Sequence, residues 1–242
     1  MKPVLASAAG LALALGLAAC ASIPATPVPQ DDLPESLRPY APEVFVPPPG
    51  AFVLLNPDVP LGEAAVWRGS ASAADPCRAP AGSGRTEPTT CLVEGLQAAG
   101  AASPAVAAAR WLSTRGDPGY LSGWRREGPV GIATVTRPLR ANTNVETVLV
   151  PPGGEALFID EAPALGFETD AIWTGFKAKQ PNAFPVPPFE LVASERHLLG
   201  WRLAYGVPLR DCRACADAGR MLVAYDFDSS GRFKERRLLS ID

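Results

Sequence analysis

Nine prolines fall between residues 21 and 50, and they constrain this part of the chain more than any other feature of the sequence. Proline fixes φ and removes a backbone donor, so this segment can form neither an α-helix nor a central β-strand. We expect an extended, partly polyproline linker with a reach of about 3.1 Å per residue where it is extended. The globular part of the chain should therefore begin near Gly50.

Length, charge and histidine content exclude several functional classes. The chain has 242 residues, enough for one sizeable domain, and its formal net charge is −3. Nucleic-acid-binding proteins usually carry a basic excess, so we expect no nucleic-acid partner. The single histidine, His197, argues against a His-rich metal site and makes any Ser-His or Cys-His chemistry depend on one residue.

The N-terminus has the pattern of an export signal. Lys2 is followed by an apolar run from residue 4 to residue 19, which is too short to span a membrane comfortably. The run ends in Leu17-Ala18-Ala19-Cys20, which resembles the lipobox of bacterial lipoproteins. The resemblance implies that the signal peptide is removed, that Cys20 is linked to diacylglycerol, and that its new amine is acylated, for example with palmitate. An ordinary secretory peptide that happens to contain a cysteine is the alternative.

The same resemblance implies a location and a domain organisation. Three acyl chains on Cys20 would be sufficient for stable membrane anchoring. Ala21 follows Cys20 in place of an Asp that would indicate inner-membrane retention. In a Gram-negative cell we therefore expect the outer membrane, and in other cells the extracytoplasmic face of the cell membrane. The expected organisation is a signal peptide (1–19), a lipidated cysteine with its Pro-rich tether (20–50) and one domain (51–242).

Residues 51–242 mix helical and β patterns. Ser103 and Pro104 are typical of a helix start and predict a helix over 104–114. Shorter helices are predicted over 120–126 and 169–179, and a long loop over 69–90. Apolar and β-branched runs predict strands at 51–55, 132–136, 145–150, 156–159, 198–207, 221–227 and 233–241. The predicted fold class is α+β, a mainly antiparallel sheet with one or two packed helices.

The four cysteines other than Cys20 are expected to form disulfides, because an even number in an exported chain is typical of a disulfide framework. They are Cys77, Cys91, Cys212 and Cys215. Three pairings are open. We favour Cys77–Cys91 with Cys212–Cys215, since each pair brackets its own loop. A zinc site built from all four is disfavoured by the oxidising location.

The Cys212-Arg213-Ala214-Cys215 motif is the one sequence motif that is typical of a reaction, and that reaction is thiol–disulfide exchange. Thioredoxin-like sites place this motif at the start of a long helix. Here only a few residues separate Cys215 from the strand predicted to begin at Met221, which favours a structural clip.

Residues 226–231, Asp-Phe-Asp-Ser-Ser-Gly, match the first half of a calcium loop. A calcium loop needs a bidentate carboxylate at its twelfth position, and that residue is Arg237. A tight β-turn explains the pattern without an ion. We expect no metal site and no cofactor.

Two further features of the sequence resemble sites. His197 is predicted at the start of a strand with Ser194 and Glu195 nearby, but the chain has no G-x-S-x-G nucleophile elbow, so we expect no catalytic residue. The last predicted strand is basic, with Arg232, Lys234 and Arg236 expected on one face. Such charges protect a sheet edge, and contact with anionic lipid is the alternative.

These observations predict a membrane-anchored envelope lipoprotein that acts through binding or assembly rather than catalysis. The expected partners are the membrane, through the lipid anchor, and an envelope protein or peptidoglycan. A thiol–disulfide oxidoreductase using Cys212 and Cys215 is the leading alternative, followed by a hydrolase using His197 and an ion-binding module at the Asp226–Gly231 turn.

Overall fold

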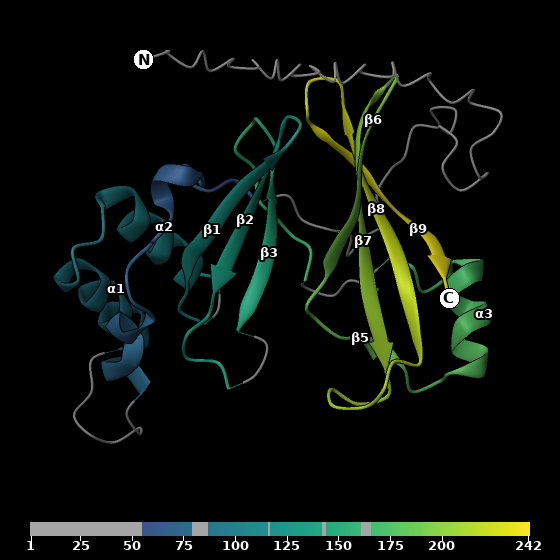
Figure 1. The fold of residues 1–242 in the computed structure, drawn as a ribbon, viewed down its shortest axis with the longest axis horizontal. Helices are drawn as coiled ribbons and strands as arrows, with labels where there is room; N and C mark the ends of the chain where they lie inside the picture. Colours follow the sequence, from purple (N-terminus) through teal and green to yellow (C-terminus); the bar gives the residue numbers. More distant parts are fainter. Residues whose placement is uncertain (1–54, 79–86, 116, 142–143, 161–165) are drawn as a thin grey trace, which may run out of the picture. The chain divides into compact units, whose positions relative to one another are not determined.

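The structure is a computed structural model that describes residues 55–78, 87–115, 117–141, 144–160 and 166–242. The chain divides into residues 1–38 and residues 39–242, and every described residue belongs to the second unit. The expected signal peptide, Cys20, the tether and the domain boundary near Gly50 lie outside the described residues. The described part confirms the predicted α+β class, because its two sheets are antiparallel and helices pack on them (Figure 1).

The first sheet has four strands in the order β1-β2-β3-β4. They are β1 (Tyr120–Glu127), β2 (Val130–Thr136), β3 (Val145–Val150) and β4 (Leu157–Phe158). The helix predicted over 120–126 is wrong, since this segment is β1 and pairs along its length with β2. Gly128 forms the hairpin turn between β1 and β2 with a φ of 57°. Pairing with a β-branched neighbouring strand has overridden the local pattern.

The second sheet contains five strands in the order β5-β7-β8-β9, with β6 also paired to β7. They are β5 (Phe184–Pro185), β6 (Glu190–His197), β7 (Gly200–Arg210), β8 (Gly219–Asp228) and β9 (Phe233–Ile241). β6 was not predicted from the sequence, and His197 is the last residue of β6 and not the start of the next strand as expected. β6 is an exposed edge strand, so it lacks the apolar alternation by which strands are recognised.

Two 3-10 helices, η3 (Glu63–Ala65) and η4 (Ala71–Arg78), precede three α-helices, α1 (Pro88–Ala98), α2 (Ser103–Ser113) and α3 (Ala171–Lys179). The predicted helices near 104–114 and 169–179 are confirmed. α3 begins as expected, with the Asp170 carboxylate accepting from the Ile172 N–H at 2.8 Å. η4 and α1 replace much of the loop predicted over 69–90. The Glu87 carboxylate caps α1 by accepting from the Thr90 N–H at 3.0 Å, and this helix was not predicted from the sequence.

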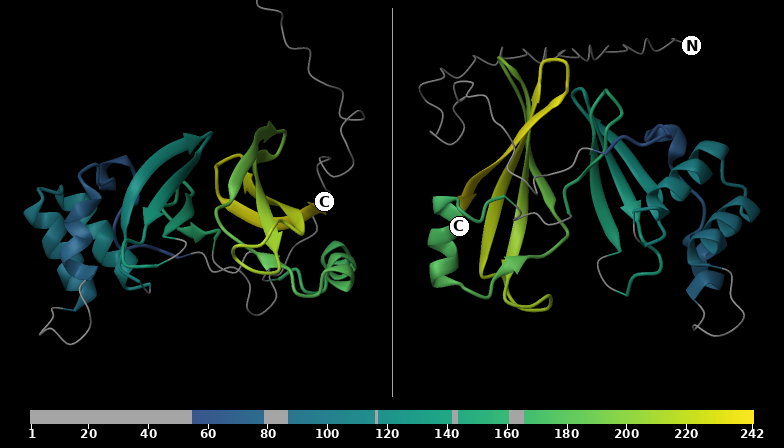
Figure 2. Two further views of the ribbon diagram at one scale, coloured as in Figure 1. Left: turned by 60° about the horizontal axis from the view of Figure 1, so that its bottom comes forward. Right: turned by 180° about the vertical axis from the view of Figure 1, so that it is seen from behind.

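The largest hydrophobic core lies between the two sheets. It joins Ile132 and Leu149 of the first sheet to Leu203, Tyr205 and Val223 of the second. The other face of the first sheet packs against α2, and α1 packs against α2 and η4 (Figure 2). Helices and the second sheet therefore cover opposite faces of the first sheet.

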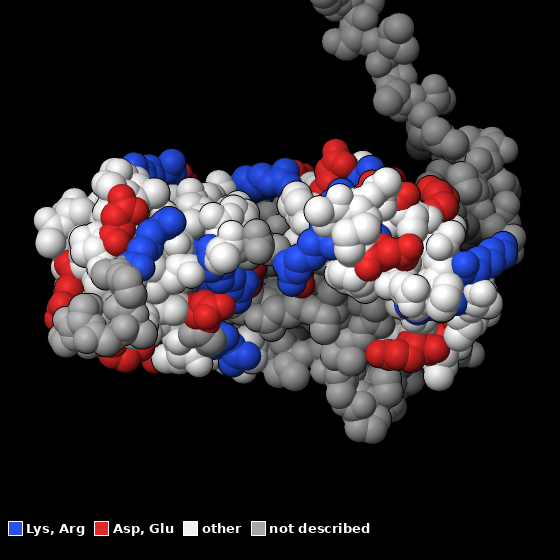
Figure 3. All heavy atoms as spheres, turned by 90° about the horizontal axis from the view of Figure 1, so that it is seen from below, with Lys and Arg blue, Asp and Glu red and all other residues white. Residues whose placement is uncertain are grey.

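Charges are distributed without strong segregation on the face shown in Figure 3, where Lys and Arg alternate with Asp and Glu. This agrees with the small formal net charge of −3. None of the described helices is long and apolar enough to cross a membrane.

Candidate functional site

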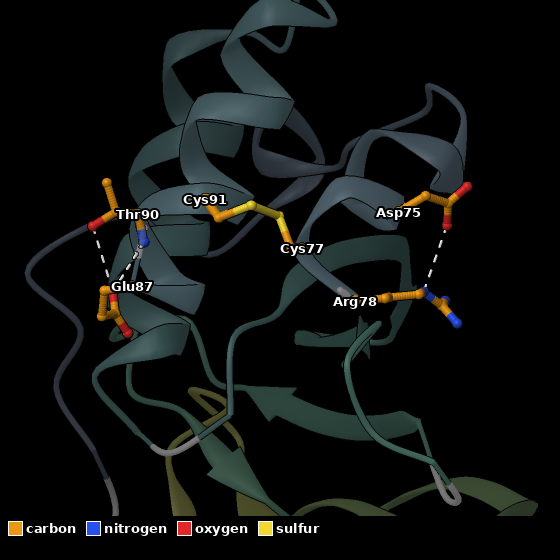
Figure 4. The surroundings of a disulfide bond; sticks show 6 residues. All are labelled: Asp75, Cys77, Arg78, Glu87, Thr90 and Cys91. Carbon is orange, nitrogen blue, oxygen red and sulfur yellow. Dashed lines mark hydrogen bonds and ion pairs between the residues drawn. A yellow bond between two sulfur atoms is a disulfide. The ribbon is translucent and has the colours of Figure 1, made fainter. Parts of the chain in front are cut away.

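The disulfide between Cys77 and Cys91 joins the end of η4 to the first turn of α1 (Figure 4). The S–S distance is 2.04 Å, and the two residues are 14 apart in sequence. The half-cystine Cys77 is buried, with 2% of its surface exposed. Beside the bridge, Arg78 forms an ion pair with Asp75 at 3.5 Å. This bridge ties two helices together inside the fold, which is a structural role.

The disulfide between Cys212 and Cys215 lies in the connection from β7 to β8, with both residues exposed. The Cys215 N–H donates to the Cys212 carbonyl at 3.1 Å, so the pair closes a tight turn. Arg210 supports the turn by pairing with Asp217 at 2.6 Å and donating to the Arg213 carbonyl at 3.2 Å.

Thioredoxin-type chemistry draws on a helix N-terminus that lowers the pKa of one thiol. The residues after Cys215 lead directly into β8, which begins at Gly219. The geometry is therefore that of a β-hairpin connection closed by a disulfide between two exposed residues.

The Asp226–Gly231 segment forms the end of β8 and the turn to β9, and both of its carboxylates have partners. Arg202 donates to Asp226 at 2.7 Å and 3.1 Å, and Arg237 donates to it at 3.0 Å. Arg237 is the residue at the twelfth position of the calcium pattern, and here it contacts the very carboxylate that would bind the ion. In the described ranges, no group of three or more His, Cys, Asp or Glu is arranged to hold a metal.

Asp228 organises the turn itself. Its Oδ1 accepts from the Ser230 N–H at 2.9 Å, the Ser230 hydroxyl at 2.6 Å and the Arg232 N–H at 3.0 Å. Burial opposes the charged form, but these hydrogen bonds to Ser230 and Arg232 outweigh it and lower the pKa of Asp228 to about 2. The turn thus uses its acidic residue as a structural acceptor.

His197 occupies the last position of β6 and takes part in the hairpin turn. Its Nδ1 accepts from the Leu199 N–H at 3.3 Å, and its Nε2 is buried. Ser194 lies three residues earlier on the same strand, so the two side chains point to opposite faces of the sheet. Glu195 lies opposite Arg202 in the neighbouring strand. The structure therefore does not bring His197 and Ser194 together as a catalytic pair.

The basic residues of the last strand do not form the single face that alternation predicted. The Arg236 guanidinium lies 4.5 Å from the centre of the Phe167 ring, and burial lowers its pKa. Lys234 and Arg232 remain exposed. A register shift between Asp226 and Phe227 in the β8–β9 pairing breaks the simple alternation.

A buried ionic network at the end of α2 was not predicted from the sequence. Arg137 is fully buried, pairs with Glu146 at 2.9 Å and donates to the Leu112 carbonyl at 3.0 Å. Arg140 bridges Glu146 and Asp117. Because Arg137 satisfies a carbonyl of the last helical turn, the network attaches α2 to the first sheet.

A hollow of about 440 Å³ lies beside α3 and the ends of β8 and β9. Its lining combines apolar and charged side chains, namely Ile172, Phe176, Lys179, Ile241 and Asp242.

Comparisons of the chain with protein-family models, with curated proteins and with solved structures found no match.

Proposed function

We propose that the protein is a lipid-anchored lipoprotein of the bacterial cell envelope, and that its domain acts by binding or assembly. Cysteine usage carries this proposal. The chain has five cysteines, and four of them are joined in two disulfides. The remaining cysteine is Cys20, at the position that a lipobox would modify. Stable disulfides are typical of oxidising compartments outside the cytoplasm, which agrees with export of the chain.

The order of segments supports the same function. A Pro-rich segment follows Cys20 and would act as a spacer between the anchor and the domain. In a Gram-negative cell the anchored protein would reside in the outer membrane, within reach of peptidoglycan and of other envelope proteins. We propose one of these as the partner of the domain.

The anchoring test compares Cys20→Ser with a control variant, Cys212→Ser. Cells expressing each chain are labelled with radioactive palmitate and separated into membrane and soluble fractions. We expect Cys20→Ser to lose the label and its stable membrane association, and Cys212→Ser to keep both. Palmitate incorporation that persists in Cys20→Ser would contradict the proposal.

The alternative is a thiol–disulfide oxidoreductase, favoured by the exposure of Cys212 and Cys215. An insulin-reduction assay distinguishes the two functions. We expect no turnover above the uncatalysed rate, because the pair lies in a β-turn rather than at a helix N-terminus. Turnover that disappears in Cys212→Ser would establish the oxidoreductase.

A further inference from the structure

The hairpin between β6 and β7 ends in two leucines. His197 and Gly200 are paired across the hairpin, so Leu198 and Leu199 form a two-residue turn. Such turns ordinarily carry Asn, Asp or Gly. The exposed fractions of Leu198 and Leu199 are 85% and 55%, the two highest among the large hydrophobic residues that the structure describes. We call Leu198 and Leu199 the hairpin tip.

The hairpin tip is held in place by its neighbours. The Leu199 N–H donates to His197 Nδ1 at 3.3 Å, which fixes the turn. Gly200 lies so close to β8 that an added Cβ would be 1.9 Å from the Phe227 carbonyl oxygen. The next residue, Trp201, packs its ring against Gly128 of the β1–β2 turn. The tip is therefore a fixed projection of the second sheet.

Other turns lie at the same end of the domain. Gly200 pairs with Asp228, where the β8–β9 turn begins, and Gly231 of that turn lies against Pro129 and Pro152. The exposed cations of these segments are Arg125, Arg126, Arg196, Arg232 and Lys234.

The acidic residues at this end offset most of that positive charge. Glu127 is paired with Arg125 at 3.1 Å, and Asp228 with Arg232 at 3.2 Å. Glu155, Glu195 and Glu235 complete the set, and Glu235 is also paired with Arg237 at 3.3 Å. Positive and negative charges at this end therefore nearly balance, and Arg196 is the exposed cation that stands two residues from Leu198. Aliphatic side chains beside cations suit a lipid surface, in which anionic headgroups cover an apolar interior.

A bilayer fits the tip better than a protein partner does. A stable protein interface buries roughly 1,000 Å² or more with good shape complementarity. Two side chains projecting from a convex turn offer much less area than that. A lipid surface needs no matching shape, because the headgroup region accommodates individual aliphatic side chains.

We propose that the hairpin tip inserts into the headgroup region of an anionic bilayer, with Arg196 and the neighbouring cations contacting lipid phosphates. This contact rests on the proposed anchoring, which holds the domain within the reach of its tether. It would bring this end of the domain back to the membrane from which the Pro-rich spacer would otherwise separate it.

The test uses the full mature lipoprotein in vesicles of phosphatidylethanolamine and phosphatidylglycerol. An environment-sensitive fluorophore is attached to Leu198→Cys after the native disulfides have formed. The matched control is Val192→Cys, which lies on β6, the strand that leads into the tip, and is 47% exposed. We expect blue-shifted emission and quenching by spin-labelled lipid at residue 198, and quenching only by an aqueous quencher at residue 192.

A second labelled chain tests the role of the leucines. The fluorophore is placed at Ser230→Cys in the neighbouring turn, with and without Leu198→Ser and Leu199→Ser. Because both leucines are exposed, the serine variants should leave the fold intact. We expect the membrane-contacting population, measured by lipid quenching, to fall roughly tenfold when the two aliphatic side chains are lost.

The outcomes separate the contact from the anchor. If the chain floats with the vesicles while its residue 198 label stays in water, the contact is overturned and the anchor stands. A chain that does not float overturns both. A label that is buried only in native envelopes, and not in protein-free vesicles, would show that a protein covers the tip and would also overturn the bilayer contact.

Discussion

Arg202 and Asp226 form a two-point ion pair across β7 and β8, with Nε 2.7 Å from Oδ1 and Nη2 3.1 Å from Oδ2. Their side chains are 5% and 9% exposed, and Arg237 contacts the same carboxylate from β9. Three adjacent strands are thus joined through one buried carboxylate. Breaking such a pair leaves an uncompensated charge in a region of low dielectric.

Asp226→Asn should therefore destabilise the domain by about 3 kcal/mol, because Arg202 and Arg237 would lose their counter-charge. Urea unfolding of the full chain and of the Asp226→Asn variant measures this loss. The control is Asp217→Asn, which removes a 2.6 Å ion pair with Arg210. The Asp217 side chain is 53% exposed. That change should cost less than about 1 kcal/mol. Equal losses in the two variants would contradict the structural role assigned to Asp226.

Asp228 should make the free energy of unfolding depend on pH in the acid range. Its hydrogen bonds lower the pKa to about 2, below the ordinary value, so the folded state favours the charged form. The stabilisation is present above the unfolded pKa and is lost as the pH falls through the folded pKa. We expect the stability difference between the native chain and Asp228→Asn to shrink by about 1 kcal/mol between about pH 5 and pH 2, after allowance for solvent screening. Urea midpoints across this range measure it, and a constant difference would be evidence against the lowered pKa.

The two disulfides should contribute unequally to stability. Cys77 and Cys91 are 14 residues apart, whereas Cys212 and Cys215 are only 3 apart. In the chain-entropy view, losing the first bridge should cost about 3 kcal/mol and losing the second about 2 kcal/mol or less. Paired Cys→Ala variants, unfolded in urea, would measure the difference. A larger loss from the Cys212–Cys215 pair would mean that its turn matters to the fold more than its loop length implies.

The sequence predicted correctly those helices and strands that are bounded by capping or turn residues. α3 lies within the helix predicted over 169–179 and begins after the Asp170 cap, and the β3–β4 and β8–β9 pairings follow from apolar runs separated by turn residues. β1 was mistaken for a helix and β6 was missed because each becomes a strand through pairing with the strand that follows it, and neither shows a clear apolar alternation of its own. β6 in particular is polar and exposed, and it becomes a strand through its pairing with β7.

The candidate sites divide in the same way. Turn chemistry at Asp228 and the exclusion of a calcium ligand at Arg237 could be read from residue spacing. The contact between Arg237 and Asp226 could not, because it requires the β8–β9 register and its bulge. The exposure of Leu198 and Leu199 was hidden for a related reason: without β6, the two leucines were read as the beginning of a strand rather than as the turn between two strands.

Replacing glycine by alanine should have opposite effects on stability at two positions. Gly200 has a φ of 154°, and an added Cβ would lie 1.9 Å from the Phe227 carbonyl oxygen. Gly175 lies inside α3, and an added Cβ would have nothing within 4 Å. Gly200→Ala should destabilise the domain by about 2 kcal/mol or more, because the backbone of β7 must move away from β8. Gly175→Ala should stabilise it by about 0.5–1 kcal/mol, because alanine restricts the unfolded chain and favours the helix. Thermal unfolding of the two variants beside the native chain would measure both effects, and a Gly200→Ala domain as stable as the native one would show that β7 and β8 do not approach each other this closely.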